Sequence, residues 1–191
     1  EHAAKKIIEL GYQLILTDID NNCICAKYAD EFIECDTFDF KANLEAADKL
    51  KIKHHISAVV TLAADCHETV ALVNKHLGLN GIDPKIAHIC RNKNITREVL
   101  TLAGIPQPKF SCVDNIEDAK SFLISIGKKG VIKSTDNSGS RGFAKINSLD
   151  ELTEEIFDNA ISSGTSGSVL IEETLIPIRE DIAELSVETL W

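Results

Sequence analysis

Aromatic side chains are scarce in this 191-residue chain, where Phe, Trp and Tyr together make up 5% while apolar residues in total make up 44%. A core of normal size must therefore be built from Ile, Leu, Val and Ala. This composition favours an α/β fold over an aromatic-rich β-sandwich. The length leaves room for one large domain or two small ones.

Long apolar runs are also missing. No stretch approaches the roughly 18 residues that a membrane-spanning helix requires, so we expect no membrane partner. Lys5 and Lys6 belong to an amphipathic pattern, which is not how a signal peptide begins.

Positive charge is in short supply, since 20 Lys and Arg residues stand against 30 Asp and Glu, giving a formal net charge of −10. A surface of this sign repels nucleic acid and anionic lipid. We therefore expect no nucleic-acid partner. A small local basic pocket could still bind an anionic substrate.

The cysteines lack the spacing of a disulfide framework, and a chain of this size does not need one. This favours a reduced, cytoplasmic setting. Cys23 and Cys25 are one residue apart, which is too close for a zinc knuckle, so we expect no structural metal in this segment. The six cysteines are Cys23, Cys25, Cys35, Cys66, Cys90 and Cys112.

The first half of the chain alternates between helical and strand patterns. Apolar spacing predicts helices at 4–10, 44–50 and 70–77, with Gly11 and Gly78 as C-terminal stops. Short apolar runs predict strands at 14–16, ending at Asp18, and at 56–62, which reads as buried on both faces. The order predicts a parallel sheet in a Rossmann-like domain over 1–90. Such a sheet opens with a strand and a glycine-rich turn, which we expect before Glu1.

The second half changes character after Asp83-Pro84. A helix starting at Asn94 or Thr96, followed by a proline-containing linker, is predicted over 91–109. Capping boxes at Asp114 and Ser148 predict two further helices. Strands are predicted at 131–133, 143–146 and 169–171, and 162–168 reads as a flexible Ser/Gly loop. Residues 110–176 are thus expected to form a small α+β lobe.

The loop at 134–142 carries the clearest chemical signal. Small residues let backbone N–H groups approach a phosphate closely, and Lys133 and Arg141 add fixed positive charge. The alternative is an ordinary charged hairpin, but the combination of residues favours phosphate binding. The loop residues concerned are Ser138, Gly139, Ser140, Arg141 and Gly142.

Two common ATP motifs are excluded by the order of elements. A Walker loop leads into a helix, whereas this loop joins two predicted strands. The glycine-rich hairpin of protein kinases precedes its lysine, whereas Lys133 comes before the loop. HRD and DFG sequences are absent.

Four segments in order resemble the ATP-grasp superfamily, in the branch of carbamoyl phosphate synthase large chains, biotin carboxylases and carboxylate–amine ligases. They are Tyr28-Ala29-Asp30-Glu31 with Asp65; Asn92-Lys93-Asn94 with Arg97 and Ala103-Gly104-Ile105-Pro106; Lys133 with the Ser138 to Gly142 loop; and Val169-Leu170-Ile171-Glu172-Glu173-Thr174-Leu175. Each is weak alone, but together they span nearly the whole chain. Pro177 departs from the family pattern, which has glycine there.

The resemblance implies specific roles in binding ATP. Lys93 and Lys133 would hold phosphates, and Glu172 would accept the adenine amino group. Backbone atoms of Glu173 and Leu175 would line the ring. Either Glu180 or Glu184 would bind the ribose, and the sequence does not choose between them.

The resemblance also implies the reaction. An ATP-grasp ligase would activate a carboxylate or bicarbonate as an acyl phosphate for attack by an amine or ammonia. Residues 177–191 would open the large lobe, and the Mg²⁺ ligands would lie downstream of Trp191, so 1–191 alone should not turn over. The alternatives are a carbamoyl-phosphate-synthase-type or biotin-carboxylase-type activity, and a non-catalytic nucleotide-sensing module. The resemblance allows a homodimer, while the acid, the amine and the oligomeric state stay open.

Overall fold

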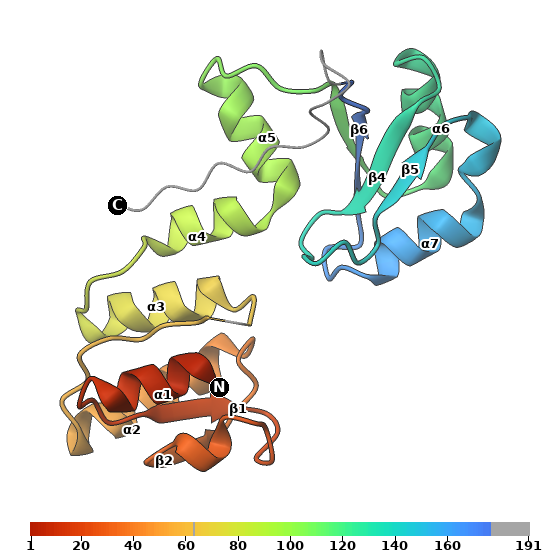
Figure 1. Ribbon diagram of the computed structural model, residues 1–191. Coiled ribbons are helices and arrows are strands. Elements are labelled where there is room, and N and C mark those ends of the chain that lie inside the picture. The colour runs from red at the N-terminus through yellow and green to blue at the C-terminus, as the bar shows by residue number, and fades with distance from the viewer. Residues whose placement is uncertain (63, 177–191) are drawn as a thin grey trace. The chain divides into compact units, whose positions relative to one another are not determined.

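The computed structural model describes residues 1–62 and 64–176, and the chain divides into two compact units, Glu1–Arg91 and the part from Asn92 onward (Figure 1). We describe each unit by itself. No helix in the described part of the chain is long and apolar enough to cross a membrane.

The first unit combines a small sheet with helices. Its elements are α1 (His2–Glu9), β1 (Ile15–Asp18), the short 3-10 helix η1 (Ala26–Tyr28), β2 (Glu31–Glu34), α2 (Phe40–Lys53), α3 (His67–Leu77) and α4 (Pro84–Arg91). Strands β1 and β2 pair in parallel, with Ile15 opposite Glu31. The predicted helices and the strand ending at Asp18 are confirmed. Gly78 ends α3 in the left-handed conformation, at φ 69°, as a C-terminal glycine should.

The predicted strand at 56–62 is wrong. No strand forms among the described residues of this stretch, and Val60 and Leu62 are 60% and 71% exposed rather than buried. Instead the side chain of Asn74 in α3 pairs with the backbone of Val59. It accepts from the Val59 N–H at 3.2 Å and donates to the Val59 carbonyl at 2.8 Å. The side-chain amide of Asn74 thus satisfies the backbone N–H and carbonyl of Val59, which a neighbouring strand would otherwise do.

Two elements of the first unit were not expected from sequence. Strand β2 lies in a charged stretch without alternating apolar residues. Helix α4 begins at the Asp83-Pro84 pair that predicted only a break. Proline suits the first helical position because it needs no N–H partner there, and the Asp83 carboxylate accepts from the Lys85 N–H at 2.8 Å.

The second unit is built on a four-stranded antiparallel sheet in the order β3-β6-β4-β5. Its elements are α5 (Lys93–Leu102), β3 (Phe110–Val113), α6 (Ile116–Ser125), β4 (Gly130–Ser134), β5 (Ala144–Ile146), the 3-10 helix η2 (Leu149–Glu151), α7 (Glu154–Ser162) and β6 (Val169–Glu173). The predicted β-loop-β hairpin and the later strand are confirmed. Strand β3 was not predicted.

The two faces of this sheet have different roles. Helices α6 and α7 cover one face (Figure 1), where Leu123 and Phe157 pack on Ile132 and Ile171 to form the core. Side chains alternate along a strand, so Val131 and Lys133 point to the face opposite the one that carries Ile132. The register places Leu170 opposite Lys133, and Glu172 opposite Val131. The face turned away from α6 and α7 therefore carries charged groups.

The helix starts differ from the predicted ones by one to five residues. Asn92 caps α5, accepting from the Ile95 N–H at 3.0 Å, and Asn115 rather than Asp114 caps α6. Ser148 precedes only η2, and α7 begins later with Thr153 as its cap. In each case several cap-competent residues lie close together, and packing of the apolar face selects among them.

Candidate functional site

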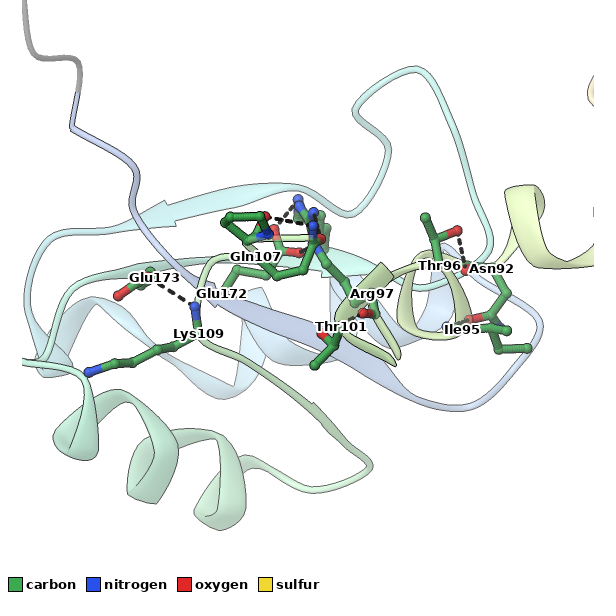
Figure 2. A network of polar contacts seen from close by, with 11 residues as sticks. Asn92, Ile95, Thr96, Arg97, Thr101, Gln107, Lys109, Glu172 and Glu173 are labelled. Atoms are coloured by element: carbon green, nitrogen blue, oxygen red, sulfur yellow. Dashed lines mark hydrogen bonds and ion pairs between the residues drawn. The ribbon is translucent and has the colours of Figure 1, made fainter. Parts of the chain in front are cut away.

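A buried carboxylate lies at the centre of the charged sheet face. Glu172, on β6, is 3% exposed. Its Oε2 pairs with Nζ of Lys133 from β4, and its Oε1 accepts from Nε of Arg97 on α5. Figure 2 shows the Arg97 side chain reaching from α5 toward Glu172. Two strands and a helix thus meet at one carboxylate.

Opposing effects act on the ionisation of Glu172. Burial raises the pKa of this carboxyl group, whereas hydrogen bonds and charges from Arg97 and Lys133 lower it. The lowering effects together outweigh burial, so the net pKa lies below its ordinary value. The group is therefore ionised at neutral pH. Since two cations share one carboxylate, the cluster keeps a positive surplus, which suits a polyanion.

Arg97 was not assigned a role from the sequence, although it lies in one of the matching segments. Its NH1 donates to Oε1 of Gln107 at 2.6 Å, and Nε2 of Gln107 donates to the Pro106 carbonyl at 2.8 Å. The guanidinium therefore joins the linker to β6. The helical position of Arg97, one turn after Lys93, was the signal that could have indicated it, because residues at this spacing share a helix face.

Lys93, at the start of α5, reaches the base of the Ser/Gly hairpin loop. Its backbone N–H donates to the Thr135 carbonyl at 2.8 Å, and its Nζ donates to the Asn137 carbonyl. Lys93 thus contacts the hairpin whose first strand, β4, carries Lys133.

The hairpin loop itself turns through left-handed backbone conformations. Gly139, Ser140 and Gly142 have φ values of 65°, 58° and 70°, and Nε of Arg141 donates to the Ser138 carbonyl at 3.1 Å. Ser138, Gly139, Ser140 and Arg141 are exposed, so the tip of the loop is accessible.

Gly142 is the exception, because it is buried against α7. A Cβ at this position would lie 2.7 Å from Cβ of Ser163 and 3.1 Å from Cα of Ala160. Its glycine therefore serves close packing of the loop's end, in addition to the turn. The sequence had grouped it with the phosphate-binding residues.

The base of the hairpin loop is tied to the loop at 162–168. The Asp136 carboxylate accepts from the Thr165 N–H at 3.1 Å and from its hydroxyl, and the Thr135 and Ser166 hydroxyls are 2.6 Å apart. At Gly164 a Cβ would lie 2.4 Å from Oδ1 of Asp136. The stretch predicted as a flexible loop is thus a bonded support for the hairpin.

The remaining predicted residues lie at the end of β6 or after it. The Glu173 N–H donates to the Lys109 carbonyl at 2.9 Å, and its Oε1 accepts from the Lys109 N–H at 2.9 Å, a pairing drawn in Figure 2. Leu175 is 71% exposed. Oγ1 of Thr174 is buried without a partner among the described residues. Glu180 and Glu184 lie outside the described residues.

The donor set fits a nucleotide better than a metal. Within residues 1–62 and 64–176, no group of three or more His, Cys, Asp or Glu side chains could hold a metal ion. The six cysteines, all in the described ranges, are free. The cationic side chains and the exposed glycine turn, in contrast, are the groups that bind phosphate.

No family model matches the chain, but comparison with known proteins finds ligases that are similar to it in sequence or in fold. The carbamoyl phosphate synthase large chain of Kocuria rhizophila is 24% identical over 196 residues, covering 100% of this chain and 17% of the relative. The L-amino acid ligase of Bacillus licheniformis has a TM-score of 0.70 at 18% identity, covering 91% of this chain and 41% of that one.

A second similar structure contains ligands. The biotin carboxylase domain dimer of Hydrogenobacter thermophilus 2-oxoglutarate carboxylase, solved with MgADP, ADP and bicarbonate, has a TM-score of 0.68 at 21% identity, covering 91% of this chain and 41% of that one. The chain thus spans less than half the length of each of these proteins. The structural neighbours are ATP-grasp ligases, so the predicted resemblance and the α/β fold class are confirmed. The Rossmann-like organisation of the first unit stays a prediction.

Proposed function

We propose that this chain supplies the ATP-binding part of an ATP-grasp ligase that activates a carboxylate or bicarbonate as an acyl phosphate, for attack by an amine or ammonia. The observation that carries the proposal is the pairing of Lys133 with the buried Glu172 on the sheet face turned away from α6 and α7. This pairing lies in a fold shared with ATP-grasp ligases.

Different residues would bind the base, the phosphates and the ribose of the nucleotide. Glu172 is ionised and accepts hydrogen bonds only, which suits the amino group of adenine. Backbone atoms of Glu173 and Leu175 would line the adenine ring. Lys133, Lys93 and Arg141, with the loop from Ser138 to Gly142, face the phosphates. Either Glu180 or Glu184 would hold the ribose.

The side chains of this chain contribute positioning and charge neutralisation rather than proton transfer. Fixed cations at the phosphates stabilise charge that spreads over the transferred group, which is the main requirement of phosphoryl transfer. Magnesium would supply further neutralisation of the phosphate charge. The described residues contain no cluster suited to coordinate it.

The domain assignment follows the same reasoning. We assign 1–90 to a Rossmann-like domain preceding the grasp, 91–109 to a connecting helix and linker, 110–176 to the small lobe and 177–191 to the start of the large lobe. The chain divides into its two compact units between Arg91 and Asn92, which supports a domain boundary near this point.

A carbamoyl-phosphate-synthase-type activity is the second candidate. It is favoured by the relative from Kocuria rhizophila, whose similarity covers the whole of this chain. Both candidates share the first step and differ in the group that attacks the acyl phosphate. A module that only senses nucleotide would bind ATP without turnover.

The full-length protein provides the test. Calorimetry should detect binding of ATP but not of NAD, and phosphate release from ATP should require both magnesium and an acid such as bicarbonate or an amino acid. Binding of NAD without ATP would contradict the proposal. ATP binding with no acid-dependent phosphate release across a panel of acids and amines would favour the sensing module.

A further inference from the structure

The carboxylate of Glu172 is held from two sides, and the two partners differ in kind. Lys133 ends in a flexible ammonium group whose direction is not fixed by its bond to Glu172. Arg97 brings a planar guanidinium that contacts Glu172 through Nε and Gln107 through NH1, the latter at 2.6 Å. Of these two partners, Arg97 is the one that connects Glu172 to a third group among the described residues.

The third group is itself well fixed. Gln107 stands between Pro106 and Pro108, whose rings lock the backbone φ angle. Its side-chain amide is also bonded to the Pro106 carbonyl at 2.8 Å. Arg97 is thus anchored at its far end, and its fork geometry transmits that orientation to Oε1 of Glu172 (Figure 2).

We propose that Arg97 is a positioning residue for base recognition: held by Gln107, it orients the Glu172 carboxylate so that the site accepts adenine and rejects guanine. The inference rests on the proposed function, because it assumes that Glu172 faces the base. Arg97 itself contacts no nucleotide. Its role is to keep Oε2 directed toward the site when the Lys133 ammonium moves to the phosphates.

The selectivity follows from the chemistry of the two bases. An ionised carboxylate can only accept hydrogen bonds. Adenine presents a donating amino group at the position where guanine presents a carbonyl oxygen, so GTP would set two acceptors against each other. A buried polar group left unpaired by the wrong ligand is an effective means of discrimination, provided that the carboxylate cannot rotate away.

The experiment measures selectivity rather than affinity alone. Dissociation constants for MgATP and MgGTP are determined by calorimetry on the full-length protein and on three variants, Arg97→Gln, Arg97→Lys and Gln107→Ala. We expect Arg97→Gln to lower the preference for ATP over GTP by roughly tenfold, which equals about 1.4 kcal/mol. Arg97→Lys should restore ATP affinity in part but not the preference, because an ammonium cannot bridge Gln107 and Glu172 together.

Gln107→Ala keeps both charges and removes only the anchor. It should lower the preference by a smaller factor, about threefold, because Arg97 keeps its charge but loses its contact with Gln107. Lys109→Gln is the matched control, since Lys109 is exposed and uses only its backbone in the contacts to Glu173. It removes one positive charge from the same unit and should leave the preference unchanged. Thermal unfolding of each variant checks that it is folded.

The outcomes separate this inference from the proposed function. If the wild type binds ATP, but folded Arg97→Gln weakens ATP and GTP equally, the positioning role is overturned while the proposed function stands. Full recovery of the preference in Arg97→Lys would also overturn it, because charge alone would then suffice. Failure of the wild type to bind ATP would remove the proposed function and this inference together.

Discussion

At the scale of single residues, burial decides whether a glutamate is a solvated surface group or part of a binding site. In the sequence Glu172 could equally be a solvated surface carboxylate, as most glutamates are. In the structure it is 3% exposed and paired with Arg97 and Lys133. A charge is kept in such a place only when partners compensate for its lost hydration. The partners therefore identify the site.

Lys133 gives the first prediction. Its loss removes a charge-assisted contact with phosphate of about 1.5–3 kcal/mol, so Lys133→Ala should weaken ATP binding roughly tenfold or more. Glu172 keeps Arg97 as a partner, so the variant should fold. Lys129→Ala is the matched control, because Lys129 is an exposed lysine just before β4. Equal dissociation constants for Lys133→Ala and the wild type would contradict the assignment.

Glu172 gives a prediction about pH. Its pKa is lowered in the folded state, so its contribution to stability is present above its unfolded pKa of about 4.3 and is lost as pH falls through the folded value. At pH 7, Glu172→Gln should cost about 3 kcal/mol, as expected for breaking a buried ion pair. Urea unfolding should show the gap from wild type narrowing below about pH 4.3.

The control for that measurement is Glu155→Gln, which changes an exposed carboxylate on α7. Its stability should stay close to that of the wild type at pH 7. A gap for Glu172→Gln that stays constant into strong acid would mean that the carboxylate is not held ionised by its partners.

At the scale of elements, the hairpin joining β4 to β5 is supported at its base and accessible at its tip. Asp136 and Thr135 bond to the loop at 162–168, and Gly142 packs on α7. The exposed tip from Ser138 to Arg141 lacks such packing. Support at the base restricts the positions that the tip can reach, so the loop can close on a ligand in a defined place.

A pair of glycines separates these two features. Both Gly139 and Gly142 have left-handed φ values, of 65° and 70°, but only Gly142 lacks room for a Cβ. Gly139→Ala should cost about 1 kcal/mol from backbone conformation alone. Gly142→Ala should cost a further 1–3 kcal/mol, roughly, from overpacking against α7. Chemical denaturation measures both, and equal losses would show that α7 yields at this point.

At the scale of the whole molecule, the described residues supply a cationic site but no metal cluster. Removing metal should therefore separate stability from activity. We expect EDTA to leave thermal unfolding of the ligand-free chain unchanged, and to abolish acid-dependent phosphate release by the full-length protein. The metal would then act only with the nucleotide. A lower melting temperature in EDTA would reveal a structural metal instead.

The elements predicted correctly are those with a strong local signal. The amphipathic helix stripes ended by Gly11 and Gly78 are one case, and the apolar strand of β6 is another. The failures have a common physical cause. Residues 56–62 have a strand composition, but a strand needs a neighbour, and Asn74 takes that place for Val59. Strand β2 shows the converse, since charged residues form a strand because β1 pairs with it.

The sequence by itself determined the α/β class, the hairpin with its preceding lysine and the resemblance to ATP-grasp ligases, because these depend on residue type and order. Only the tertiary structure decided that Arg97 and Gln107 belong with Glu172, since these residues come from a helix, a linker and a strand separated by up to 75 positions. It also decided that Gly142 serves packing as well as the turn. Contacts between distant segments arise only when the chain is folded, and local pattern does not encode them.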